Sequence, residues 1–287
     1  MSSGPKIFDR RLLRVRQARA LARGPTTFLI DGVATELGDR LSAVLRRFDI
    51  VADLGTPTDA VRRALAASGK VGTVLAVKAD EEVLPFADSS LDLVVSALAL
   101  QFVNDLPGTL IQIRRALRPD GLLLAALIGG ESLTELRAAF AAAESEVEGG
   151  ISPRVAPFAD IRELGALLQR AGFALPVVDS EKVVVRYDSV FGLMRDLRGM
   201  GATNVQHERR RTPLRRATLQ RMAAIYAERF ADADQRVRAT FEIVWLSGWA
   251  PHESQQKPLK PGSAAQRLAD ALGTTEMSAG EKPERSR

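Results

Sequence analysis

The chain has 287 residues, no cysteine and only two histidines, His207 and His252, and 46% of its residues are hydrophobic. This composition is that of a globular protein with one main core, and it excludes disulfides, thiolate metal ligands and cysteine nucleophiles. Two well-separated histidines give no support to a histidine-built metal centre or a Ser-His-Asp triad. The longest apolar run, "LLLAALI" from Leu122, is far shorter than the roughly 20 residues of a membrane-spanning helix, so no transmembrane segment is expected.

The net charge of +5 is concentrated in two segments. Residues 1–25 carry seven Lys or Arg and one Asp, and residues 207–221 carry six Arg and one Glu, so the rest of the chain is acidic on balance. This unevenness favours docking of an acidic protein partner, with solvated surfaces as the alternative. No aromatic residues interleave with the arginines, so nucleic acid is not an expected partner. The predicted basic patch consists of Arg209, Arg210, Arg211, Arg215 and Arg216.

Hydrophobic periodicity and cap residues predict helices and strands in alternation along most of the chain. The expected order is a helix over 26–48, a strand over 49–53, a helix over 60–68, strands over 71–78 and from Leu91, a helix over 106–117, a turn at 118–121, a strand over 122–128, helices over 131–146 and 160–172, a strand within 177–189, helices within 190–201 and 213–230, and a last strand over 237–250. We expect a basic N-terminal segment (1–25), a main domain (26–250) with a helical insertion (188–230), and an extended to disordered tail (251–287).

This order predicts an α/β, Rossmann-like sheet with helices on both faces and an antiparallel edge strand. It is the plan of the class I methyltransferases that use S-adenosylmethionine (SAM). Ligands bind such sheets beyond the carboxyl ends of the strands, so the candidate site is the set of turns after Asp53, Lys78 and Val95. The expected cofactor-binding residues in this part of the chain are Asp53, Gly55, Thr56, Asp80, Glu81, Ala97 and Leu98.

The first turn, "DLGTPTD", is narrower than a glycine-rich nucleotide-binding turn, because only Gly55 allows close approach of a ligand. Only 25 residues separate Gly55 from Asp80, too few for two helix–strand units at about 10 to 12 residues per crossover plus the strands. One βα unit is therefore shortened or absent, together with the acid that ends its strand. Asp80 lies at the spacing of a ribose-binding acid, and a surface or capping acid is the alternative.

Longer motifs reach over residues 6 to 266, among them "IFDRRLLRVRQARA", "ADEEVLPFADSSLDLVVSALAL", "FVNDLPGTLIQIRRALRPDG", "DLRGMGATN" and "GWAPHESQQKPLKPGSA". Together they resemble the methyltransferase-fold assembly factors of respiratory complex I, whose mitochondrial members are linked to arginine hydroxylation of a peripheral-arm subunit. The resemblance implies a protein that acts on or holds such a subunit. It also implies a place in the bacterial cytoplasm, including the inner-membrane surface, or in the mitochondrial matrix of a eukaryote.

The resemblance also bears on single residues. Asp80 and Glu81 match the position after the family's third strand, which faces the adenine, while Gln101 and Phe102 replace a His-Trp pair. With the altered first turn, three usual contacts of SAM differ, which predicts an unusual or a degenerate cofactor site. No catalytic residue and no metal ligand can be assigned from the sequence.

A substrate or partner surface is expected in the second half of the chain. Its residues are Arg198, Gly199, Met200, Gly201 and Asn204, with Trp249, His252 and Gln255 lining the same mouth. A helix C-cap at Gly199 or Gly201 and edge-strand packing of Trp249 are the structural alternatives. Two other functions stay open: an active SAM-dependent methyltransferase resembling the carrier-protein methyltransferases of biotin synthesis, and a noncatalytic protein that holds an acidic partner.

Overall fold

The computed structural model describes residues 6–77, 82–256, 270 and 273–275. The chain divides into two units, Met1–His252 and Glu253–Arg287, and the first unit contains every helix and strand that is named below. Its elements in chain order are α1 (Arg10–Ala22), α2 (Phe28–Ala43), β1 (Phe48–Leu54), α3 (Ala60–Ser68), β2 (Val71–Val77), β3 (Leu91–Ala97), the short 3-10 helix η1 (Leu100–Phe102), α4 (Leu106–Ala116), β4 (Leu117–Ile128), α5 (Thr134–Glu148), α6 (Ile161–Arg170), β5 (Ala174–Tyr187), α7 (Val190–Gly199), α8 (Arg216–Phe230) and β6 (Val237–Trp249). Among the described residues, no helix combines the length and the apolar character that spanning a bilayer requires.

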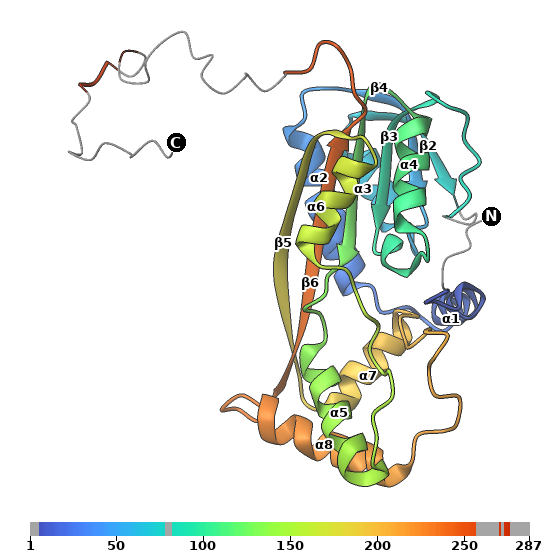
Figure 1. The fold of residues 1–287 in the computed structure, drawn as a ribbon, viewed down its shortest axis with the longest axis vertical. Helices are drawn as coiled ribbons and strands as arrows, with labels where there is room; N and C mark the ends of the chain where they lie inside the picture. Colours follow the sequence, from blue (N-terminus) through green and yellow to red (C-terminus); the bar gives the residue numbers. More distant parts are fainter. Residues whose placement is uncertain (1–5, 78–81, 257–269, 271–272, 276–287) are drawn as a thin grey trace, which may run out of the picture. The chain divides into compact units, whose positions relative to one another are not determined.

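The strands form one six-stranded sheet in the order β2-β1-β3-β4-β6-β5. The strands β2, β1, β3 and β4 run parallel to one another, and β6 pairs antiparallel with both β4 and β5. Figure 1 shows β5 and β6 continuing beyond the rest of the sheet to the helices α5, α7 and α8. The α/β fold and the mixed sheet predicted from the sequence are confirmed.

Alternate residues of the central strands enter two separate cores, as the period of two in a strand requires. On one face, Val51, Leu93 and Leu124 pack against α2 and α3. On the other face, Val94 and Leu123 pack against α4 and α6. The sheet is therefore covered on both sides, which places its ligand-binding edges at the ends of the strands.

The last strand differs from the prediction in its place. β6 was expected to close an edge of the sheet, but it lies between β4 and β5, and β5 forms the edge. The burial of the two strands explains the order: β6 is buried along most of its length, whereas β5 alternates between half-buried and exposed residues. A long, nearly continuous apolar strand buries more surface with a neighbour on each side than it would at an edge.

Two local predictions also differ from the structure. The helix expected over 26–48 ends at Ala43, and Val44 is already extended. The turn expected at 118–121 lies inside β4, whose pairing with β3 changes register between Leu91 and Leu93. Asp120 takes a positive φ of 63°, so the chain bends there without leaving the sheet.

The shortened βα unit has a structural counterpart. In the described residues between β1 and β3, only α3 and β2 are regular elements, and β2 lies at the edge beside β1. Most of β2 is half-buried or exposed despite its apolar sequence, and Leu75 is 40% exposed. A further βα unit would cover this edge, so its absence here explains the exposure.

Candidate functional site

The first turn at the carboxyl edge of the sheet keeps its glycine conformation. Gly55 has φ 72°, in the left-handed region that favours glycine, and its N–H donates to Val77 O at 3.1 Å. Thr56 is buried, and its Oγ1 accepts a hydrogen bond from the Ala97 N–H at 3.3 Å. The turn is thus tied to the end of β3 through Thr56, and the Ala97 N–H already has a partner within the protein.

Asp53 ends the predicted strand and is only 2% exposed. Its Oδ2 accepts from Arg62 Nη1 of α3 at 3.0 Å, whereas its Oδ1 accepts no hydrogen bond from a described residue. Burial raises the pKa of Asp53, and the Thr56 hydroxyl and the Arg62 guanidinium oppose that rise. The carboxylate therefore interacts with the protein itself at this edge.

The space beyond these turns is small. An apolar cavity of about 90 Å³ lies between the carboxyl edge and α1, and Pro57, Thr58 and Leu98 contribute to its wall. Known small-molecule sites measure about 300 to 1,000 Å³, so the space that the described residues leave at this edge is smaller than a usual ligand site. Asp80 and Glu81, the other expected cofactor contacts, lie outside the described residues.

The cover over this cavity is α1 with the loop that follows it, and two glycines of the "RGMG" motif allow them to come close: Gly201 lies against α1, and Gly199 lies against the loop. A Cβ on Gly201 would lie 2.8 Å from the Cα of Gln17, and Gly201 has φ 69°. A Cβ on Gly199 would overlap the Thr26 hydroxyl. The helix α7 ends at Gly199 with Met200 as its C-cap, and Gly201 follows with a positive φ, so the helix-end alternative applies to Gly201. The place of both glycines in a partner surface stays a prediction.

The structure joins the two basic segments that the sequence keeps about 190 residues apart. The N–H of Asp9 donates to Val205 O, and the N–H of His207 donates to Ile7 O, each at 2.8 Å. Arg209 pairs with Asp9 at 3.2 Å, and the Arg16 guanidinium donates to Asn204 O. The N-terminal segment is therefore an integral part of the first unit.

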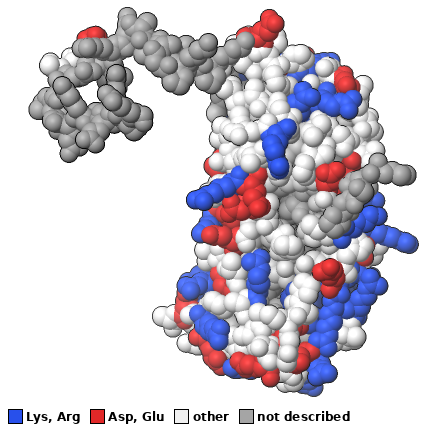
Figure 2. Space-filling model, in the orientation of Figure 1, with Lys and Arg blue, Asp and Glu red and all other residues white. Residues whose placement is uncertain are grey.

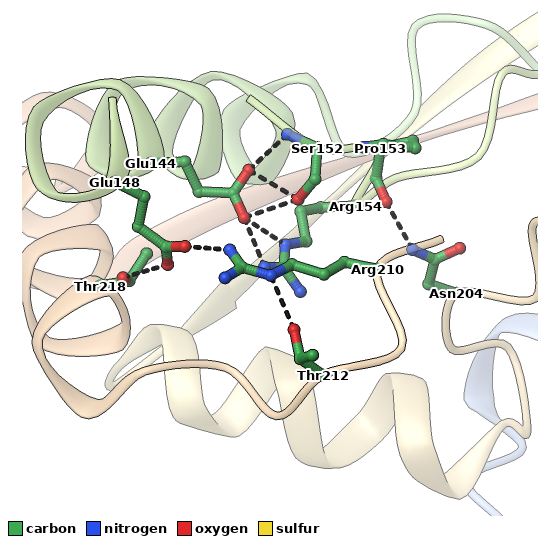
Figure 3. Close-up of polar contacts among 9 residues, drawn as sticks. All are labelled: Glu144, Glu148, Ser152, Pro153, Arg154, Asn204, Arg210, Thr212 and Thr218. Carbon is green, nitrogen blue, oxygen red and sulfur yellow. Dashed lines mark hydrogen bonds and ion pairs between the residues drawn. The ribbon is translucent and has the colours of Figure 1, made fainter. Parts of the chain in front are cut away.

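A buried carboxylate on α5 fixes the neighbouring loops. Glu144 is 1% exposed and accepts hydrogen bonds from the Ser152 N–H (2.7 Å), the Ser152 hydroxyl and Arg154 Nε (2.7 Å). Figure 3 shows this cluster beside Glu148, which accepts from Arg210 and Thr218. Burial would raise the pKa of Glu144, but the hydrogen bonds from Ser152 and Arg154 outweigh it and hold the pKa below its usual value.

The predicted surface residues fall into two groups. Arg198 and Asn204 line a hollow of about 520 Å³ together with Arg209, Arg210 and Arg211, and Met200 lines the apolar cavity. Arg215 and Arg216 line none of these hollows. The predicted basic patch is thereby divided between a cleft and an exposed helix end.

Trp249 does not lie at this mouth. Because β6 runs antiparallel to β4, Trp249 pairs with Leu122 near the start of β4, whereas Ile128 at the other end of β4 lines the cavity. The N–H of Ala250 donates to Gly121 O, beside Leu122 and therefore also at the end of β4 that is far from the cavity. His252 follows two residues later in the chain. Gln255 belongs to the second unit, and its role stays a prediction.

Sequence reasoning missed several residues of this region. Arg154 and Glu144 were not singled out, nor were Arg19 and Arg23 as members of one site with Arg198. The only sequence signal for Arg19 and Arg23 was the charge count of residues 1–25. Among the described residues, no group of three or more His, Cys, Asp or Glu side chains is arranged as metal ligands.

Known proteins similar to this chain decide its family. It is 38% identical over 289 residues to the mitochondrial arginine-hydroxylase NDUFAF5 of Danio rerio, covering 93% of this chain and 90% of the relative. The chain belongs to the NDUFAF5 arginine-hydroxylase family. The human protein of the same name is 40% identical over 281 residues, which is 90% of this chain and 81% of the human one.

Other matches cover part of this NDUFAF5 relative. Residues 39–125 match the family described as a methyltransferase domain. A malonyl-[acyl-carrier protein] O-methyltransferase of Xylella fastidiosa is 40% identical over 172 residues, covering 60% of this chain and 56% of that protein. A solved structure of a candidate methyltransferase from Bacillus halodurans has a TM-score of 0.51 at 14% identity, over 76% of this chain and 99% of that one, and shows the shared fold.

Proposed function

We propose that this NDUFAF5 relative is an assembly factor for respiratory complex I that holds a peripheral-arm subunit, and that its cofactor site is degenerate. The observation that carries the proposal is the extent of the similarity. The NDUFAF5 relatives match about 90% of the chain or more, well beyond residues 39–125, which match the methyltransferase-domain family. Among the elements that line the hollow of about 520 Å³, α1, α7 and the segment that follows α7 lie outside residues 39–125.

The closed carboxyl edge supports holding over methyl transfer. Thr56 uses the Ala97 N–H, Asp53 faces Arg62, and about 90 Å³ of space is left under α1. In this arrangement the Ala97 N–H and one oxygen of Asp53 are already used within the protein, and α1 lies over the remaining space. The proposal places the protein in the cytoplasm of a bacterium, where its partner is exposed during assembly.

Deletion of the gene in its source organism tests the assembly role. Native gels stained for NADH dehydrogenase activity should show loss of assembled complex I, and reintroducing the wild-type gene should restore it. Normal complex I in the deletion strain would refute the proposal. Mass spectrometry of the peripheral-arm subunits from both strains separates holding from modification, because a hydroxylase leaves an arginine one oxygen atom heavier in the wild type alone.

The alternative is an active methyltransferase acting on a carrier protein, and the 40% identity to the Xylella fastidiosa protein is the observation that favours it. Purified protein, labelled SAM and malonyl-carrier protein would then yield a labelled ester. The holding proposal predicts no label above the level of a no-enzyme control. A rapid transfer would replace the proposal with this alternative.

A further inference from the structure

A cleft lined by arginines joins α1, α7 and the segment after α7. A hollow of about 720 Å³ is lined by Arg16, Arg19 and Arg23 of the N-terminal segment and by Arg195 and Arg198 of α7. It shares Arg16 and Arg198 with the adjoining hollow of about 520 Å³. Figure 2 shows Lys and Arg side chains gathered on the lower right of the molecule, where Figure 1 places α1 and the loop after α7. We call these two hollows the arginine cleft.

Most arginines of this cleft have no acidic partner among the described residues. No described residue forms an ion pair or a side-chain hydrogen bond with Arg19, Arg23, Arg195, Arg198 or Arg211. Elsewhere in the first unit, exposed arginines are commonly paired, as Arg115 is with Asp88 and Arg186 with Asp232. The larger hollow has no Asp or Glu in its lining.

Arginines that lie close together repel one another, and the helix ends of the fold offset only part of this repulsion. Burial, and then the charges of Arg209 and Arg19, lower the pKa of Arg16. Arg19 and Arg198 lie in the last turns of α1 and α7, where the helix dipole favours a cation by a fraction of a kcal/mol. Since no carboxylate of the described protein completes the arrangement, the missing anions are expected from a ligand.

We propose that the arginine cleft binds an acidic, extended peptide segment of the subunit that this protein holds; this deepens the proposed function and depends on it. The carboxylates of the segment pair with Arg19, Arg23, Arg195 and Arg198. Apolar side chains of the segment enter the adjoining hollow, whose wall includes Phe140, Met194 and Leu214.

The shape and the lining of the cleft favour a peptide over other anions. The charges lie in two hollows, whereas a membrane surface would meet a projecting basic face. The larger hollow contains no aromatic side chain, so a single-stranded nucleic acid would find no stacking platform among the unpaired arginines. Arginine and apolar side chains together are the usual composition of a strong protein-binding surface.

Charge reversal in the cleft tests the proposal with the full chain. The probe is a fluorescein-labelled peptide of about ten residues that mixes Asp and Glu with Leu and Ala, long enough at roughly 3.3 Å per residue to reach both hollows. Its binding is measured by fluorescence anisotropy to wild type and to the double variant Arg19→Glu/Arg198→Glu. Both side chains are exposed, so the variant should keep the wild-type circular dichroism and unfolding midpoint.

A matched control is available in Arg215→Glu/Arg216→Glu, which makes the same change of charge on exposed residues outside the cleft. We expect the cleft variant to bind the peptide at least about tenfold more weakly and the control to bind within about twofold of wild type. Raising the salt from about 50 to about 500 mM should weaken wild type and control far more than the cleft variant.

Besides failure of the peptide to bind, two results would overturn the proposal. One is equal loss of binding in the cleft variant and the control, which would assign the effect to net charge. The other is tighter, cleft-dependent binding of phosphatidylserine vesicles or of a labelled single-stranded RNA than of the acidic peptide. If the peptide fails to bind and the deletion strain still lacks complex I, the cleft inference fails while the assembly role stands. If the peptide binds in the cleft and the deletion strain assembles normal complex I, the assembly role fails while the cleft remains a peptide-binding site.

Discussion

Replacing Glu144 by Gln should destabilise the first unit through a cluster that joins α5 to the loops around the cleft. Gln retains the shape but loses the charge that holds Arg154, and it offers one acceptor oxygen to donors that now use two. Breaking a buried ion pair on one side costs about 3 kcal/mol or more. For a domain of this size that free energy lowers the unfolding midpoint by roughly 6 to 12 °C.

Differential scanning calorimetry at neutral pH measures this shift, and Glu146→Gln on the same helix is the control. Glu146 pairs with Arg221 at the surface, so its replacement should change the midpoint little. The hydrogen bonds lower the pKa of Glu144 in the folded state, so its contribution exists above the usual value of 4.5 and is lost as the pH falls through the folded pKa. The gap between wild type and Glu144→Gln should therefore shrink at acid pH. Equal midpoints for wild type and Glu144→Gln at neutral pH would refute the reasoning.

Two further predictions concern the covered cofactor edge. Gly201→Ala should lower the free energy of unfolding by about 1 to 3 kcal/mol, because φ is positive and the new Cβ would meet the Gln17 backbone. Trypsin should then cut α1 faster. Gly32→Ala, with open space and an ordinary φ, is the control, and equal cleavage of both variants would contradict the packing of α1. Asp53→Asn should leave the unfolding midpoint unchanged or raise it at neutral pH, because burial raises the pKa of Asp53 and disfavours its charged form; a fall of more than about 4 °C would show that the Arg62 pair stabilises the fold.

Local chemistry let the sequence predict most of the sheet and its helices. Asp105 caps α4 by accepting from the Gly108 N–H, and Gly69 and Gly172 take positive φ after α3 and α6, as the cap signals indicated. The 25-residue interval from Gly55 to Asp80 predicted a shortened βα unit from length alone. These features depend on neighbours in the chain, so the sequence contains their cause.

The arginine cleft depends on contacts that have no local signal. Residues 7–9 meet residues 205–207 through backbone hydrogen bonds, which any sequence can form, so the convergence of the two basic segments could not be read from side chains. The sequence predicted β6 at an edge, because an apolar strand can lie either inside a sheet or at an edge that another element covers, and its apolar residues alone do not distinguish the two places. Trp249 was expected at the end of the sheet where the cavity lies, but the antiparallel direction of β6 places it at the other end.

Equilibrium dialysis of the purified full-length protein against labelled SAM tests the central claim most directly, with a SAM-dependent methyltransferase as positive control. The account holds that a methyltransferase fold with a closed carboxyl edge serves here to hold a partner. It predicts no bound label up to millimolar SAM in the absence of partner. Stoichiometric binding with a micromolar Kd would contradict it and would show that α1 opens over a working cofactor site.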